Sequence, residues 1–334
     1  MSEHRYEGTW KLPDIEQEQE GILFIDSEKG IIRLKVFVMS ENGWGFAHKL
    51  KTVCSIITGN LIGNNKITLV DSTVVNRHKY LGRYTEVIVQ TKWAFWGVHY
   101  LSMDEVKCNK YSVDMDGILN WCSLCKFDTD NLNDYKWVKS EKIEVKMKDN
   151  LSLHFIPICK GGKGTTLIEK DLRLEQYIEI DFEYVDSTCL EDFIEDLKSL
   201  EMLITVGAGN IPLRRNLYYY DNRNKMFPGI SDIIKPREIY MGEKQYSDGY
   251  ETHNINMLFG LKDIVSENQF PISQWSEIAE KIKPAINLYF SIIKYYDMPI
   301  EMKYLNIMQA LETYHARFKY CLLYTSPSPR DISG

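Results

Sequence analysis

A short stretch of the chain combines basic and aromatic side chains in a pattern that can recognise nucleic acid. Arg214, Arg215 and Arg223 bracket the run Tyr218-Tyr-Tyr220. On single-stranded nucleic-acid surfaces, basic groups hold phosphates while aromatic rings stack on bases. We therefore predict a candidate nucleic-acid or nucleotide surface formed by Arg214, Arg215, Tyr218 and Arg223. A strand that shows amphipathic basic side chains to solvent accounts for the same pattern, so both interpretations stay open.

Three further motifs resemble known binding motifs, but each lacks a residue or a spacing that the motif requires. Cys122-Ser-Leu-Cys125 is a single C-x-x-C pair without a second pair or histidines at zinc spacing, so we predict core packing. Gly161-Gly-Lys-Gly164 lacks the spacing of a phosphate loop, and we predict a hairpin loop. Gly207-Ala-Gly209 lacks the third glycine of a dinucleotide fingerprint and predicts the end of a helix. The sequence therefore predicts neither a bound metal nor a cofactor.

Composition sets broader limits on function. The 334 residues carry a formal net charge of −7, so no overall basic field attracts nucleic acid, although a local basic patch remains compatible with this charge. The sequence opens with no signal peptide and contains no run of membrane-spanning length, which predicts a cytoplasmic protein outside the membrane. Acidic residues are plentiful, but no spacing singles out the carboxylate pair that a glycoside hydrolase needs.

The N-terminal part is a succession of short strands separated by turns. Ser27-Glu-Lys-Gly30 is a turn sequence between two strands, which predicts a hairpin. The expected strands are Gly21–Asp26, Ile31–Val38, Ser55–Ile62, Lys66–Val75, Tyr84–Gln90, Trp93–Leu101 and Tyr111–Asp114. A short helix is expected over 117–124. This order favours an antiparallel sandwich or barrel.

A second set of strands ends in a longer helix. The expected strands are Lys142–Lys148, Leu151–Cys159, Leu167–Leu174, Tyr177–Tyr184, Leu213–Tyr220 and Glu238–Tyr240. Between the fourth and fifth, Asp186-Ser-Thr188 is expected to cap a helix over Cys189–Thr205. Both sets place strands before a helix, so a duplicated unit with halves 1–140 and 141–255 is one interpretation of the β-rich region 1–255.

Residues 256–320 read as helical. Helices are expected over Ile278–Ile282 and Ala285–Tyr296, separated at Pro284, and a final helix over Ile300–Tyr320. Its apolar residues recur at helical spacing and form one stripe: Ile300, Tyr304, Ile307, Met308, Leu311, Tyr314 and Phe318. A stripe of this kind needs a partner surface.

The last residues differ from the rest of the chain. Cys321–Gly334 reads as the translation of a sequencing-library adaptor, so we set it aside from fold reasoning. We expect the natural protein to continue past Tyr320, with the partner of the final stripe in the missing part.

Several stretches, taken in order, resemble the ApeA family of bacterial anti-phage proteins. The first four match its N-terminal domain and the last two match the passage into a C-terminal helical HEPN domain. They are Gly8-Thr-Trp-Lys-Leu-Pro13, Gly21-Ile-Leu-Phe24, Gly97-Val-His-Tyr100, Leu119-Asn-Trp121, Ile282-Lys-Pro-Ala-Ile-Asn-Leu-Tyr-Phe290 and Met308-Gln-Ala-Leu-Glu-Thr-Tyr-His315. The resemblance spans nearly all of residues 6–320.

The resemblance implies abortive-infection defence by a ribonuclease that needs no metal. Its catalytic signature is Arg followed, after about four to six residues, by His, which serves as general acid or base while Arg holds the phosphate. No arginine of this sequence has a histidine at that spacing. Glu312, His315 and Arg317 are the nearest candidates for the rim of the cleft. A solvated helix face with one histidine at its edge accounts for them equally well.

We therefore expect an α+β protein: an antiparallel β-rich region, sandwich or barrel-like, followed by helices that begin a truncated HEPN bundle. The fragment itself is expected to be inactive. RNA would bind through the missing domain, the full-length protein would act as a homodimer, and the phage trigger is unknown. The rival hypothesis is a β-sandwich that binds a carbohydrate or nucleotide and carries a helical oligomerisation tail. Exposure of Trp93, Trp96 and Tyr100 would favour that rival.

Overall fold

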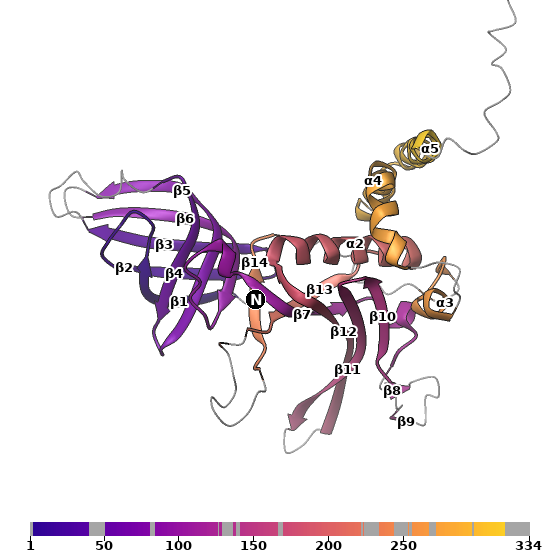
Figure 1. Cartoon of the computed structure of the whole chain (residues 1–334), viewed down its shortest axis with the longest axis horizontal. Coiled ribbons are helices and arrows are strands. Elements are labelled where there is room, and N and C mark those ends of the chain that lie inside the picture. Colours follow the sequence, from indigo (N-terminus) through magenta and orange to yellow (C-terminus); the bar gives the residue numbers. More distant parts are fainter. Residues whose placement is uncertain are drawn as a thin grey trace, which may run out of the picture.

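The protein is described by a computed structural model, in which an antiparallel sheet leads into a helical segment (Figure 1). This confirms the expected α+β class with a β-rich N-terminal region. The residues described are 3–39, 51–80, 84–125, 127–128, 136–137, 141–165, 170–221, 223, 234–243, 253, 256–266, 272–295 and 297–317. The adaptor-like residues 321–334 lie outside this set.

The first six strands form a closed barrel. They are β1 (Glu3–Lys11), β2 (Gln19–Asp26), β3 (Ile31–Met39), β4 (Val53–Leu61), β5 (Asn65–Tyr80) and β6 (Tyr84–Trp96). Each strand pairs antiparallel with two others, in the cyclic order β1, β2, β3, β6, β5, β4 and back to β1. Closure leaves no free edge along the paired segments. The sequence predicted two strands where β6 runs unbroken through Thr91 and Lys92.

Trp10 of β1 fills the barrel interior and explains why two strands carry glycine beside it. A Cβ atom added at Gly21 or Gly59 would collide with the Trp10 ring, which is fully buried. The ring is surrounded by aliphatic side chains from the other strands, including Leu23 and Leu34. Inward-facing residues alternate with outward-facing ones along each strand, which is the period that the sequence displays. The barrel therefore has its own core.

A second sheet continues from the barrel. Its strands are β7 (Lys107–Asp116), β10 (Ile143–Lys148), β11 (Leu151–Thr165), β12 (Lys170–Cys189), β13 (Leu213–Tyr219) and β14 (Arg237–Met241). Their order is β10-β11-β12-β7-β13-β14, and β14 joins the barrel by pairing with β6. Smaller elements complete this region: η1 (Met103–Glu105), α1 (Leu119–Cys122), β8 (Phe127–Asp128) and β9 (Lys136–Trp137). Gly161 and Gly164 lie within β11, not in the hairpin loop predicted for them.

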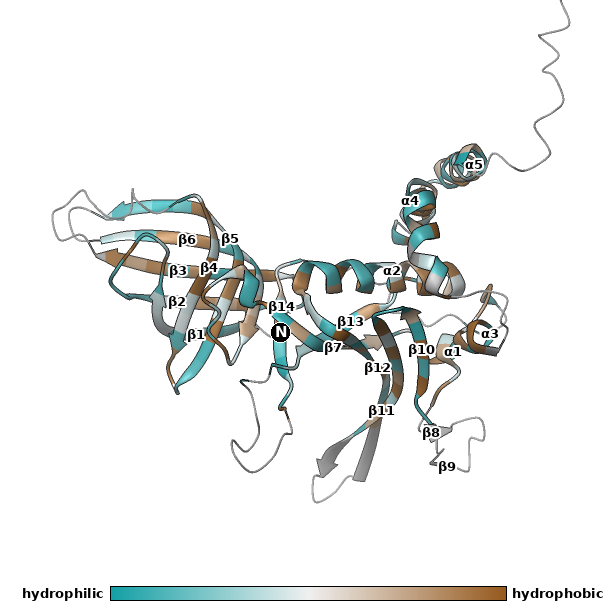
Figure 2. Cartoon of the chain, viewed as in Figure 1, coloured by the Kyte–Doolittle hydropathy of each residue, from teal (hydrophilic) through white to brown (hydrophobic). Residues whose placement is uncertain are grey.

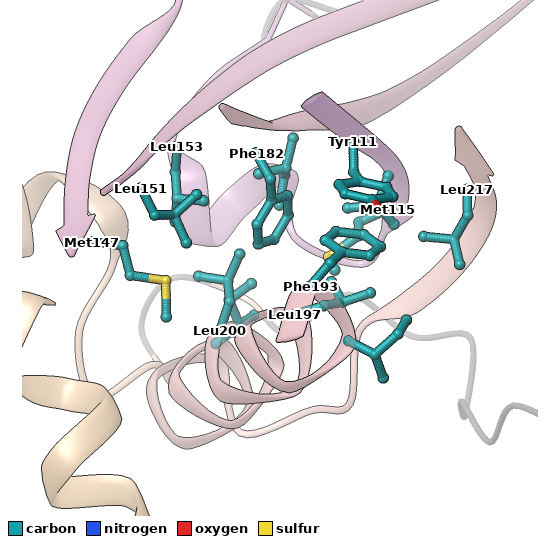
Figure 3. Close-up of a cluster of buried hydrophobic side chains, with 14 of the residues drawn as sticks. Tyr111, Met115, Met147, Leu151, Leu153, Phe182, Phe193, Leu197, Leu200 and Leu217 are labelled. Atoms are coloured by element: carbon teal, nitrogen blue, oxygen red, sulfur yellow. The ribbon is translucent and has the colours of Figure 1, made fainter. Parts of the chain in front are cut away.

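Helix α2 (Leu190–Ala208) covers one face of this second sheet. Phe193 stacks on Tyr111 of β7 with ring centroids 4.2 Å apart, and its other neighbour is Phe182 of β12. Figure 3 shows Leu197 and Leu200 on the same side of the helix, facing the sheet. Burial of this stripe removes apolar surface from water and stabilises the packing of α2 on the second sheet.

The ends of α2 are only partly as predicted. Gly209 adopts φ 74° and ends the helix, which confirms the glycine C-cap. The predicted cap at Asp186-Ser-Thr188 is wrong, because β12 runs on to Cys189. Cys189 is the N-cap residue and its side chain makes no capping hydrogen bond. Pairing of Thr188 with Cys108 of β7 keeps these residues extended, and this outweighs their local capping tendency.

Three further helices follow: α3 (Leu261–Ser266), α4 (Ile272–Lys294) and α5 (Ile300–Arg317). The predicted break at Pro284 is wrong, since α4 passes through it without interruption. Proline removes one backbone donor and frees the carbonyl of the residue four positions earlier. That residue is Glu280, and both Glu280 and Pro284 are exposed, so water can hydrogen-bond to the free carbonyl.

The domain boundaries expected from the sequence stay predictions. Strands from both expected halves share the second sheet, because β7 pairs with β12 and with β13. The barrel itself ends at Trp96. Within the described part of the chain, no helix is long and apolar enough to cross a membrane.

Candidate functional site

Arg214, the first residue of the predicted nucleic-acid surface, faces α2. A β-bulge separates it from Asn216 in the pairing of β13 with β7. Its guanidinium forms a two-pronged ion pair with Glu201 of α2, and the side chain is only 12% exposed. One guanidinium nitrogen also lies 3.3 Å from the sulfur of Met241. Arg214 thus ties β13 to α2 and is not available to a phosphate group.

Arg215 lies on the opposite side of the sheet. We call this side the polar face; its members alternate with the core residues of β7, β12 and β13, and they are Lys110, Ser112, Asp114, Asp116, Tyr177, Glu179, Asp181, Glu183, Arg215 and Tyr218. Arg215 pairs with Glu175 and Asp116, and its guanidinium lies 5.3 Å from the centre of the Tyr177 ring. These carboxylates raise the pKa of Arg215 and neutralise its charge.

The other two predicted residues are also engaged by carboxylates. The Tyr218 hydroxyl lies 3.4 Å from Asp114 Oδ2, and burial together with that carboxylate raises the pKa of Tyr218. Arg223 pairs with Asp221 at 2.7 Å and stacks 4.5 Å from the Tyr100 ring. Burial opposes ionisation of Asp221, but hydrogen bonds from Arg223 outweigh it and hold the pKa of that carboxyl below its usual value.

The four predicted residues therefore do not assemble into one basic surface. Arg214 is on the α2 side, Arg215 and Tyr218 are on the polar face, and Arg223 follows the end of β13. Each arginine has at least one carboxylate partner. Binding of nucleic acid by these residues stays a prediction, and it would require breaking ion pairs first.

The aromatic segment after β6 belongs mainly to the core. Trp93 is 5% exposed, while Phe95 and Tyr100 are fully buried. Phe95 packs edge-on against both Tyr100 and Tyr219, with ring centroids 5.3 and 5.2 Å apart. Trp96 is partly buried at the end of the barrel. The binding-module hypothesis predicted that this segment lines an exposed groove. That prediction is wrong, because Trp93 and Tyr100 are buried.

Helix α5 contacts its neighbour through its polar side, whereas an amphipathic helix usually packs through its apolar side. Its polar side faces α4, where the Asn306 amide donates to the Ser291 hydroxyl at 3.0 Å. Arg317 donates to the carbonyl of Lys281 at 2.9 Å. Its apolar stripe lies at the surface: the exposed residues are Ile300, Tyr304, Ile307, Met308, Leu311 and Tyr314. No residue of α5 is buried, and Figure 2 shows hydrophobic and hydrophilic residues mixed along it.

The three candidate cleft-rim residues lie on this helix. Glu312, His315 and Arg317 are all exposed. His315 lies beside Tyr314, with ring centroids 6.2 Å apart. Arg317 is turned toward α4 by its bond to Lys281, so the three side chains do not converge on one point. Their role at a cleft stays a prediction.

A cavity of about 650 Å³ lies between α2 and α4, beside the start of β13 and the end of β14. Ion pairs line it: Lys148 with Asp196, Arg214 with Glu201, and Lys283 with Glu280. Tyr184 adds a hydrogen bond to Asp196 at 3.0 Å. Because basic and acidic groups largely neutralise one another, the lining favours neither anions nor cations.

One end of this cavity is closed by a fixed contact. The Trp275 indole nitrogen donates to the carbonyl of Ser199 at 2.7 Å, and Ala279 is buried one turn further along. Beyond these residues α4 separates from α2 and leads to α5, as Figure 1 shows. The cavity thus occupies the joint at which the helical segment meets the β-rich region.

The described residues offer little nucleophilic chemistry near this joint. Cys108 is a buried thiol, and burial raises its pKa to about 12, with Asp221 contributing. A thiol of this pKa is not a nucleophile at neutral pH. No group of histidine, cysteine and acidic residues in the described part could hold a metal ion. The ion pairs that line the cavity could not be anticipated from the sequence, because Lys148 and Asp196 are far apart along the chain.

Comparison with known proteins gives one match. A family model described as ApeA N-terminal domain 1 matches residues 5–275, which is most of the chain. No curated protein matches, and no solved structure matches.

Proposed function

The chain belongs to the ApeA family of anti-phage defence proteins. We propose that its β-rich region controls a ribonuclease domain of HEPN type, and that α4 and α5 are the first helices of this domain. The family model ends at residue 275, within α4, so the helices beyond it are not part of the matched domain. The β-rich region, in this proposal, senses the infection and the helical part cleaves RNA.

The packing of α5 is the observation that carries this proposal. A helix that turns its polar side to its neighbour leaves its apolar side exposed, and this is the state of the α5 stripe in the described part of the chain. Exposed apolar surface of this extent normally marks an interface. A helical bundle supplies such a partner, because its helices pack apolar stripes against one another.

The joint between α2 and α4 supports the controlling role of the β-rich region. Trp275 and Ala279 fix the start of α4 to α2, and the rest of the helix borders the cavity. A change in the sheet that moved α2 would therefore tilt α4 and α5 together. Control of this kind needs two arrangements of the joint with different affinities for the trigger.

The cleavage chemistry in this proposal comes from residues outside 1–317. An arginine would hold the phosphate and a histidine would act on the ribose 2′-hydroxyl, with no metal. No arginine in this sequence has a histidine about four to six residues later. Glu312 and His315 would border the cleft from α5, and the active assembly would be a homodimer.

The experiment compares this chain with a longer product of the uncut gene. Both are incubated with labelled RNA, and cells that express each are challenged with phage. We expect cleavage and protection only from the longer product. In that product, Leu311→Glu should abolish both effects, because Leu311 would be buried in the bundle. The matched control is Gln309→Glu, on the polar side of α5, which should retain them.

Two outcomes would overturn the proposal. Full RNA cleavage by Leu311→Glu would mean that the stripe is not part of the active fold. A longer product that forms stable oligomers through α5, protects cells and cleaves no RNA would favour the rival hypothesis, in which α4 and α5 are an oligomerisation tail.

A further inference from the structure

The polar face of the second sheet carries an ordered set of acidic side chains. In the antiparallel pairing of β12 with β7, Glu179 lies opposite Asp114 and Asp181 lies opposite Ser112. Asn216 of β13 lies on the other side of Asp114. Opposite residues in such a ladder have Cβ atoms about 4.5–5.5 Å apart, so Glu179, Asp114 and Asn216 form one row across three strands.

Acidic groups at the margin of this face are neutralised. Arg215 pairs with Asp116 and Glu175 at one end of the face. Lys110 pairs with Asp181 and Glu183 at the other end, at 2.5 and 2.9 Å. Four of the carboxylates thus have a cation in direct contact, which is the usual state of acids in a sheet.

The two central acids have no such contact. Asp114 is 1% exposed; its Oδ2 accepts from the Asn216 amide at 3.0 Å, while its Oδ1 is buried without a hydrogen-bond partner among the described residues. Glu179 is partly exposed, and its side-chain carboxylate has neither a hydrogen bond nor an ion pair within the described ranges. Lys160 and Arg215 influence Asp114 only at longer range. A buried acceptor without a donor is costly, and its presence needs a reason.

Aromatic rings border this central pair. The Lys160 ammonium lies 4.8 Å from the centre of the Tyr177 ring, and the Lys110 ammonium lies 5.0 Å from that of Tyr220. Tyr218 donates toward Asp114 from the neighbouring strand. The face therefore already holds two ammonium groups beside tyrosine rings, and one of them, that of Lys110, also contacts carboxylates.

We propose that Asp114 and Glu179 form the base of a binding site for the cationic head group of an organic ligand, a primary ammonium or a guanidinium. Such a group brings several N–H donors, which Asp114 Oδ1 and the Glu179 carboxylate could accept, and the faces of tyrosine rings attract its positive charge. Glu179 and Lys160 are the more exposed residues beside Asp114, so a ligand would enter from their side and displace the Lys160 ammonium from the Tyr177 ring.

Binding to this site is measured by isothermal titration calorimetry on the whole chain. The probes are agmatine and spermidine, with 1,4-butanediol as the uncharged control. N-acetyl-arginine amide distinguishes a small amine from a basic side chain of a peptide: preference for it over agmatine would assign the site to a peptide. We expect saturable one-to-one heat with a cationic probe and none with butanediol.

Two variants and one control test whether the measured heat of binding comes from Asp114 and Glu179. Glu179→Gln replaces a carboxylate that has no hydrogen-bond or ion-pair partner among the described residues, so the fold should be retained, and we expect affinity to fall about tenfold or more. Asp114→Asn should act in the same direction. The control is Glu175→Gln on the same strand, whose acid is already held by Arg215; its affinity should stay within about twofold. Equal weakening by all three variants would mean non-specific attraction and would overturn the proposal, as would the absence of heat from every cation.

Proton release gives an independent readout. Burial raises the pKa of Asp114, and burial with the nearby Asp181 and Asp114 raises that of Glu179. A bound cation favours the ionised forms, so binding releases protons and affinity rises with pH through the raised pKa values. The other titratable groups that act on the pair are Lys110, Lys160, Asp181, Arg215, Tyr177, Tyr218 and Tyr220. Heats measured in buffers of different ionisation enthalpy should show release in the native chain and less in Glu179→Gln. This site does not depend on RNA cleavage, so either proposal can fail alone.

Discussion

Helices α2 and α5 have the same kind of sequence and opposite environments. Both carry one apolar stripe at helical spacing. The stripe of α2 is buried, with Phe193, Leu197 and Leu200 fully covered by the second sheet. The stripe of α5 is exposed, with Ile300 at 77% and Leu311 at 52%. An amphipathic pattern thus predicts that a face requires a partner and does not say whether this part of the chain supplies it.

The polar sides of the two helices differ in a corresponding way. On α2, Glu201 and Asp196 hold basic groups of the sheet around the cavity. On α5, Asn306 and Arg317 each donate a single hydrogen bond to α4. Hydrogen bonds of this kind contribute about 1 kcal/mol each, whereas a buried stripe contributes several times more. We therefore expect α5 to be held weakly in this chain.

The largest effect should come from the buried stripe. Phe193→Ala removes a ring that stacks on Tyr111, and we expect a loss of about 3–5 kcal/mol in the free energy of unfolding. The matched change on α5, Leu311→Ala, should alter it by less than about 0.5 kcal/mol. Denaturant unfolding of both variants tests the comparison. Similar losses from the two would mean that the α5 stripe is covered in solution.

The contact between α2 and α4 should rank next. Trp275→Phe removes the donor to the Ser199 carbonyl, and we expect about 1–3 kcal/mol of destabilisation, concentrated in α4. Hydrogen exchange should become faster in α4 and α5 and stay unchanged in α2. Tyr304→Phe on α5, where the ring is 63% exposed, is the control and should have no effect. Uniform loss of protection in α2 as well would contradict the idea of a joint.

A smaller effect is expected where α5 meets α4. Asn306→Ala removes the bond to Ser291, and we expect about 0.5–1.5 kcal/mol of local destabilisation. Amide exchange within α5 should accelerate by roughly tenfold, while the melting of the β-rich region stays the same. Gln309→Ala, at an exposed position of the same helix, is the control. Unchanged exchange in Asn306→Ala would show that other contacts hold α5.

The smallest effect on stability should come from a charge in the exposed stripe. Ile307→Glu should leave the free energy of unfolding within about 0.5 kcal/mol, because the side chain is already 43% exposed. Sedimentation velocity at several concentrations should then show less self-association than in the native chain, since the apolar patch is interrupted. A loss of several kcal/mol would place Ile307 in a buried contact and end the contrast with α2.

Much of the β-rich fold was predictable from local pattern. Alternation along Ile31–Val38 and the turn at Gly30, which adopts φ 61°, specify the β2–β3 hairpin. Closure of the barrel was one of two predicted outcomes, and it depends on β6 pairing with both β3 and β5. Local propensity also failed at Cys189, where strand pairing keeps the chain extended, and at Pro284, which lies inside an uninterrupted α4.

The candidate sites were much less predictable. Arg214 and Arg215 are neighbours in sequence, yet they lie on opposite sides of the sheet and meet different carboxylates. Asp114 and Glu179 stand far apart along the chain and come together only because β7 pairs with β12. Nothing in the spacing of acidic residues could indicate this pair, because strand pairing is a long-range property.

The sequence alone determined which residues alternate, which helices carry a stripe and where glycine permits a turn. These features follow from backbone geometry over a few residues, so they are visible in local spacing. The tertiary structure decided which stripe is covered, which arginines are neutralised and which two acids are left without a cation. Those outcomes depend on which surfaces meet, and burial and charge compensation exist only once distant segments are in contact.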